Sequence, residues 1–173
     1  LENAASLRRA LGYCAAHGIG AFRVNSQILP LKTHPQAGYA VGELPQADAI
    51  VSAFQACAET ARALGIRLSF HPDQFILLSA RDEAIVAASV RELVYQAEVA
   101  EWVNADVINL HAGGAYGDKP AALRRLAGVI ETLPAAVRKR LTLENDDRTY
   151  TPRDLLPLCL AAVPVIAALS PRD

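Results

Sequence analysis

Several features are missing from this sequence, and each absence narrows the class of protein. There is no methionine among the 173 residues, so we expect either residues in front of Leu1 or a translation start elsewhere. No run approaches the ~18 consecutive apolar residues that a membrane-spanning helix needs. The first residues also lack the basic and apolar segments of a signal peptide. The composition is otherwise that of an ordinary globular domain.

An excess of one charge is also absent. Lys and Arg number 17 against 18 Asp and Glu, for a net charge of −1. Surfaces that coat nucleic acid without sequence preference usually carry a basic excess. Any contact with DNA must therefore come from a local site. The cysteines, Cys14, Cys57 and Cys159, form no C-x-x-C pair, which argues against a zinc site built from cysteines or a disulfide framework and predicts buried thiols.

Helix-like and strand-like stretches alternate along the chain. Helices are predicted over residues 3–17, 47–64, 82–103, 121–132 and from 152, and strands over 21–24, 66–70, 106–110, 141–143 and from 163. This order predicts a parallel sheet covered by helices. Each strand–helix unit takes about 36 residues, so eight would need about 280, the range of a (β/α)₈ barrel. No glycine-rich motif is present that would support an open nucleotide-binding sheet. The sequence therefore leaves two architectures open, an open sheet and part of a barrel.

Polar residues stand where the strands end. His71, His111 and Glu144 each follow an apolar strand. In parallel α/β folds the ligand lies beyond the carboxyl ends of the strands, so these side chains are expected to converge. Two imidazoles and one carboxylate suit Zn²⁺, Mn²⁺ or Fe²⁺ better than Ca²⁺ or Mg²⁺. A lone histidine there is more often structural, but three residues in register favour a metal site.

Three further motifs each allow more than one interpretation. His34, in a long loop, is a metal ligand, a phosphate contact or a simple loop residue. Gln74 and Phe75 could wedge into stacked bases, but the residues alone favour Phe75 packing beneath its loop. Gly113-Gly114 either lets a ligand approach the backbone or forms a tight turn.

Four segments, considered together, carry a resemblance to a known family. They are Ile28–Pro35, Ser69–Phe75, Asn109–Lys119 and Leu143–Arg148. In order and spacing they resemble the ultraviolet damage endonuclease family, and the resemblance extends from about Asn3 to Ile166. It implies a (β/α)₈ TIM barrel of the xylose-isomerase-like or apurinic-endonuclease-like type. About five of the eight strands would be present here, as one partial domain over residues 1–173.

The resemblance also implies an activity and its residues. The family binds divalent metals, with Mn²⁺ favoured over Zn²⁺ or Mg²⁺. It cuts the phosphodiester bond 5′ of cyclobutane dimers and 6-4 photoproducts in duplex DNA. His71, His111 and Glu144 match catalytic metal ligands, with Glu144 bridging two ions. Gln74 and Phe75 match the pair that probes the duplex opposite the lesion, and His34 matches a histidine that lines the site.

Parts of the family pattern are absent from the sequence. The family has a strand before the first helix here, and metal-binding Asp and His residues after the position of Ile166. We therefore expect a fragment or a truncated product that is inactive alone. The expected partner is ultraviolet-damaged double-stranded DNA, with no membrane, in a cytoplasmic protein that is monomeric at full length. The alternatives are a sugar isomerase or epimerase barrel, and a non-catalytic remnant that binds metal or DNA.

Overall fold

Strands and helices alternate along the chain, as the hydrophobic periodicity predicts. The computed structural model describes residues 1–146, 148–161 and 166–168. Two units are distinguished, residues 1–71 with 98–107 and residues 72–97 with 108–173, and each is described by itself. The single domain expected over residues 1–173 stays a prediction. Among the described helices, none has the length and apolar character needed to cross a membrane.

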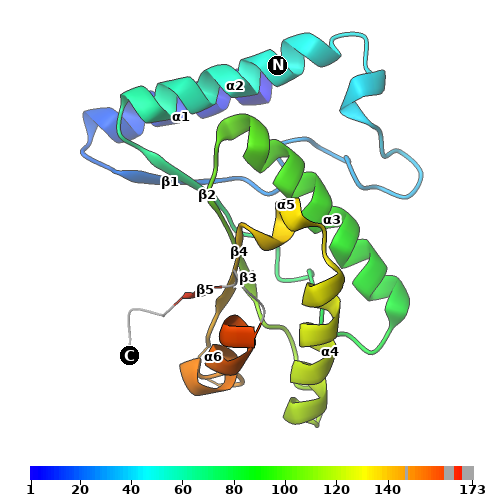
Figure 1. Cartoon of the computed structure of the whole chain (residues 1–173). Helices are drawn as coiled ribbons and strands as arrows, with labels where there is room; N and C mark the ends of the chain where they lie inside the picture. The colour runs from blue at the N-terminus through cyan, green and yellow to red at the C-terminus, as the bar shows by residue number, and fades with distance from the viewer. Residues whose placement is uncertain (147, 162–165, 169–173) are drawn as a thin grey trace. The chain divides into compact units, whose positions relative to one another are not determined.

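The first unit pairs two helices and two strands. Its elements are α1 (Glu2–Ala16), β1 (Ala21–Val24), the 3₁₀ turn η1 (Val41–Glu43), α2 (Ala47–Ala63) and β2 (Arg67–Phe70). Strands β1 and β2 are parallel, with Val24 opposite Phe70. Helices α1 and α2 lie side by side (Figure 1), and the Cys57 thiol of α2 donates to the carbonyl of Ala4 in α1 at 3.3 Å. Cys14 and Cys57 are buried free thiols, as predicted, whereas Cys159 is only partly buried.

The second unit contains three parallel strands in chain order. Its elements are most of α3 (Glu83–Val103), then β3 (Val107–His111), α4 (Lys119–Thr132), α5 (Ala135–Arg138), β4 (Leu141–Glu144), α6 (Pro152–Ala161) and β5 (Ile166–Ala168). Strand β4 pairs with β3 on one side and with β5 on the other. These strand–helix repeats are the units from which an α/β barrel is built.

The observed boundaries differ from the expected ones by a few residues, for local reasons. Helix α4 begins before residue 121 because the Asp118 carboxylate caps it, accepting from the Ala121 N–H at 3.0 Å. Pro120 suits this first turn because it needs no N–H partner there. Helix α5 was not predicted, since four residues are too few to show a helical period. Of the last expected strand, residues 163–165 lie outside the described residues.

Alternation along β3 decides which side chains face a ligand. Ile108 and Leu110 are almost completely buried. Successive side chains of a strand point to opposite faces, so Asn109 and His111 share the other face. Residues opposite each other on paired strands share a face too, and Glu144 lies opposite His111. The hydrophobic contacts of Ile108 and Leu110 thereby hold the polar face in place.

Candidate functional site

His111 and Glu144 form the centre of the candidate site, at the ends of two paired strands. They are register partners, just as Asn109 is the partner of Thr142 two residues earlier. His111 is exposed, and Glu144 is partly exposed. One ligand atom from each of His71, His111 and Glu144 lies within 4.8 Å of the other two. Two ring nitrogens and a carboxylate oxygen at this spacing can be bridged by one divalent cation, whose bonds to such atoms are about 2.0–2.2 Å.

A chain of hydrogen bonds orients the Glu144 carboxylate. The Thr142 hydroxyl donates to Oδ1 of Asn109 at 2.7 Å, and Nδ2 of Asn109 donates to Oε2 of Glu144 at 2.5 Å. One carboxylate oxygen of Glu144 is thus held in place by the Asn109 side chain. Asn109 and Thr142 were not among the predicted site residues. Their signal is polarity at every second position of an otherwise apolar strand, on the face that carries His111.

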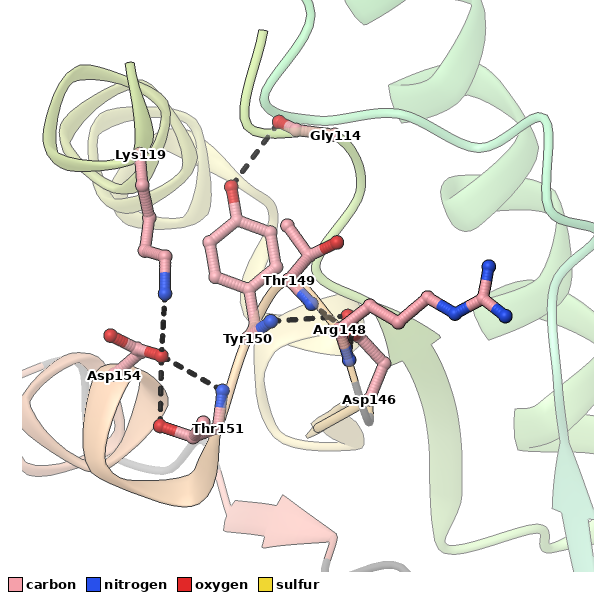
Figure 2. A network of polar contacts seen from close by, with 8 residues as sticks. All are labelled: Gly114, Lys119, Asp146, Arg148, Thr149, Tyr150, Thr151 and Asp154. Carbon is pink, nitrogen blue, oxygen red and sulfur yellow. Dashed lines mark hydrogen bonds and ion pairs between the residues drawn. The ribbon is translucent and has the colours of Figure 1, made fainter. Parts of the chain in front are cut away.

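The loop after β4 is organised around Asp146. Its carboxylate accepts from the backbone N–H groups of Arg148 at 2.7 Å and Tyr150 at 3.2 Å, and from that of Thr149 (Figure 2). Burial alone would raise the pKa of Asp146. The N–H groups of Thr149, Arg148 and Tyr150, together with the nearby His111, outweigh burial and lower this pKa. The Asp146 carboxylate is therefore an anchor for the loop.

Tyr150 connects this loop to the loop after β3. The side chain is completely buried, and its hydroxyl donates to the carbonyl of Gly114 at 3.2 Å (Figure 2). Burial, followed by the neighbouring Tyr116, raises the pKa of the Tyr150 hydroxyl. It therefore stays protonated as a donor at neutral pH.

The chain's own side chains occupy the space above Gly113 and Gly114. Gly113 has a φ of +85°, and a Cβ there would lie 2.7 Å from the Ser79 hydroxyl oxygen. A Cβ on Gly114 would lie 3.3 Å from the Tyr116 ring. The glycines are therefore needed for packing within the unit. This replaces the interpretation in which they make room for a ligand.

The remaining predicted site residues are Gln74, Phe75 and His34. Gln74 and Phe75 lie in an exposed turn, and Phe75 is 72% exposed, so the expectation that Phe75 packs beneath its loop is wrong. His34 is exposed, and its Nδ1 accepts from the N–H groups of Gln36 and Ala37 at 3.1 Å each. These two bonds organise the His34 turn, and a role for His34 toward metal or phosphate stays a prediction.

Comparison with solved structures shows the fold class of the chain. The crystal structure of SacUVDE is similar to this chain with a TM-score of 0.82 at 28% identity. The similarity covers 93% of this chain and 55% of the SacUVDE chain. Endonuclease IV from Thermus thermophilus reaches 0.64 at 23% identity, and D-psicose 3-epimerase from Clostridium cellulolyticum reaches 0.68 at 13%, each covering 94% of this chain and 57% of the other. These last two show the fold alone. The class is the xylose-isomerase-like TIM barrel, and this chain forms part of such a barrel.

Sequence comparison then identifies the family. The family model described as UV-endonuclease UvdE matches residues 1–169, so the chain belongs to this family. A UV DNA damage endonuclease of Bacillus velezensis is 36% identical over 163 residues, which are 91% of this chain and 48% of the relative. One of Bacillus thuringiensis is 34% identical, covering 91% of this chain and 49% of the relative. The chain spans about half the length of the curated relatives it matches.

The ion pair at the start of α6 makes stability depend on pH. Asp154 accepts from the N–H and the hydroxyl of Thr151 at 2.8 Å each, and lies 3.0 Å from Nζ of Lys119 (Figure 2). The Thr151 N–H is the largest of these influences, followed by the Thr151 hydroxyl and Lys119, and together they lower the pKa of Asp154. A carboxyl with a lowered pKa stabilises the folded state above its unfolded pKa of ~3.9, and that stabilisation is lost as the pH falls.

We therefore expect Asp154→Asn to lower the thermal unfolding midpoint at pH 7. The difference from the unaltered protein should shrink as the pH falls below about 4, where the native carboxyl is protonated too. Thermal unfolding followed by circular dichroism between pH 7 and pH 3 measures this. Asp48→Asn, at an exposed position of α2, makes the same charge change and should give a smaller shift. A difference that stays constant with pH would contradict the assignment.

Proposed function

We propose that this chain is part of a DNA repair endonuclease that cuts the phosphodiester bond 5′ of ultraviolet photoproducts in duplex DNA. The carrying observation is that His71, His111 and Glu144 present ligand atoms within 4.8 Å of one another, in a chain that the UV-endonuclease family model matches over residues 1–169. The substrate would be damaged DNA, consistent with the names of the Bacillus relatives. We further propose a cytoplasmic protein that is monomeric at full length.

The donor set fits a divalent metal. His71, His111 and Glu144 would hold it, and a mixed nitrogen and oxygen set favours Mn²⁺ or Zn²⁺ over Mg²⁺. When bound, such a metal supplies a nucleophile at neutral pH and offsets charge that develops on the phosphate. Asn109 keeps one Glu144 oxygen engaged at 2.5 Å, so the carboxylate presents its other oxygen in a constant direction.

The exposed turn at Gln74 and Phe75 supports a role with duplex DNA. The Phe75 ring is 72% exposed and therefore accessible, and insertion between bases would remove it from solvent. Damaged bases stack poorly, so their extrusion costs less than that of intact bases. Selectivity for lesions would then follow from the duplex as much as from the protein. A monosaccharide pocket has no need of this turn, and the likeness to D-psicose 3-epimerase at 13% identity concerns the fold alone.

Nicking of supercoiled plasmid by the whole protein that contains this chain tests the proposal. With Mn²⁺ present, we expect nicks in irradiated plasmid, few in unirradiated plasmid, and none after chelation of the metal. His111→Ala should reduce the rate by on the order of 100-fold, because it removes a metal ligand. His17→Ala, at the exposed histidine that follows α1, should leave the rate unchanged. Equal nicking of irradiated and unirradiated plasmid would refute lesion specificity, and epimerisation of a ketose would favour the sugar-barrel alternative.

Replacing both Gln74 and Phe75 by alanine should weaken binding to irradiated duplex about tenfold or more, because stacking on a base is lost. Metal content should not change, since neither side chain belongs to the donor set. Fluorescence anisotropy with a labelled oligonucleotide and metal analysis give the two measurements. Leu156→Ala removes another exposed apolar side chain and serves as the control. Joint loss of metal and DNA binding would show that the turn is structural instead.

Asn109→Ala should weaken Mn²⁺ binding by roughly 10- to 100-fold, because the Glu144 carboxylate loses the donor that orients it. Thr142→Val removes the preceding donor in the chain and should have a smaller effect. Titration followed by electron paramagnetic resonance measures the affinity independently of activity. Asn3→Ala, which deletes an asparagine hydrogen bond to Ile28 in the first unit, is the matched control. An unchanged affinity in Asn109→Ala would exclude Asn109 as a positioning residue.

A further inference from the structure

Two arginines of the second unit gather around one tyrosine ring. The guanidinium carbon of Arg81 lies 6.0 Å from the centre of the Tyr116 ring, and that of Arg125 lies 5.7 Å from it. Arg81 also donates to the Tyr116 carbonyl, and Nε of Arg125 donates to the Ser79 carbonyl at 2.9 Å. We call Arg81, Tyr116 and Arg125 the Tyr116 cluster.

Neither arginine of the Tyr116 cluster forms an ion pair with a carboxylate in the part of the chain that the structure describes. Two positive charges near one ring repel each other. In the same part of the chain, Nη2 of Arg125 is buried and has no hydrogen-bond partner. This nitrogen is enclosed by the protein, so it holds positive charge at the cluster without being a contact for a ligand. The absence of ion pairs on Arg81 and Arg125 among the described residues points to an anion.

The cluster is held in place before any ligand binds. Tyr116 has a φ of +52°, a left-handed conformation that costs a non-glycine residue energy, and its ring packs against Gly114. The Gly114 carbonyl is in turn fixed by the Tyr150 hydroxyl at 3.2 Å (Figure 2). Arg81 is exposed, so its remaining N–H groups face solvent. An accessible guanidinium whose position is set by contacts with the Tyr116 ring and carbonyl is suited to a phosphate oxygen.

We propose that the Tyr116 cluster binds a phosphate of the nucleic-acid backbone, with Arg81 as the accessible contact. This inference rests on the proposed function, since it assumes that DNA is the substrate. The net charge of −1 means that affinity for a polyanion must come from local groups of this kind. Tyr116 lies in the loop that follows β3, the strand that ends at His111. Such a contact would position DNA and would carry no base specificity.

The salt dependence of DNA binding by the whole protein tests this site. The probe is a labelled undamaged duplex, titrated at several KCl concentrations with the metal at constant concentration. Losing one phosphate contact lowers the slope of log K against log salt by about 0.9. We expect this reduction, with weaker binding at low salt, for Arg81→Gln. Arg81→Lys keeps the charge and should retain most of the slope. Arg124→Gln, at an exposed neighbouring position of α4, should retain all of it.

Each outcome decides between this inference and its alternatives. A slope for Arg81→Gln equal to that of Arg124→Gln, in a protein that still cuts irradiated plasmid, would overturn the phosphate site and leave the proposed function standing. Equal losses in Arg81→Gln and Arg81→Lys, with a lower thermal midpoint, would overturn it in favour of a structural role. Inorganic phosphate that displaces DNA only at molar ionic strength supports a backbone contact, whereas displacement at micromolar phosphate would assign the cluster to free phosphate. No duplex binding by the unaltered protein would overturn both proposals.

Discussion

The pairing register of β3 with β4 is the constraint on which the candidate site depends. It places His111 opposite Glu144 and Asn109 opposite Thr142, so that four polar side chains share one face. A slip of one residue would turn each of them to the opposite face, because side chains alternate along a strand. The burial of Ile108, Leu110, Leu141 and Leu143 makes such a slip costly, since it would expose them. The apolar face thus fixes the geometry of the polar one.

The loops beyond these strands are joined to each other by hydrogen bonds. Tyr150 reaches the carbonyl of Gly114, and Ser79 donates to the carbonyl of Ala112 at 3.2 Å. Each bond joins a loop to the loop after β3, so the residues around His111 are supported from two directions. Residues that bind a ligand must be held by their neighbours if affinity is not to be lost in ordering them. The buried hydroxyls of Ser79 and Tyr150 have this supporting role.

A nearly neutral chain that acts on a polyanion has to concentrate positive charge where it is needed. Arg67 and Lys119 are paired with Asp106 and Asp154 and have little net charge to offer. Arg81 and Arg125 have no such partner among the described residues. The distribution of ion pairs, rather than the total charge, therefore distinguishes structural cations from candidates for binding. His17 differs from His111 in a similar way, because the His17 ring already has a structural contact in its stack on the Tyr13 ring.

The sequence by itself determined the element order and the family. Hydrophobic periodicity located most helices and strands, and the segments around His71, His111 and Glu144 identified the family that the comparison shows. Local patterns carry such information because helix and strand periods are properties of neighbouring residues. The exposure of Phe75, the bond from Asn109 to Glu144 and the Tyr116 cluster were decided only by tertiary structure. Arg81, Tyr116 and Arg125 belong to separate segments, and no local pattern reports that packing brings their side chains around one ring.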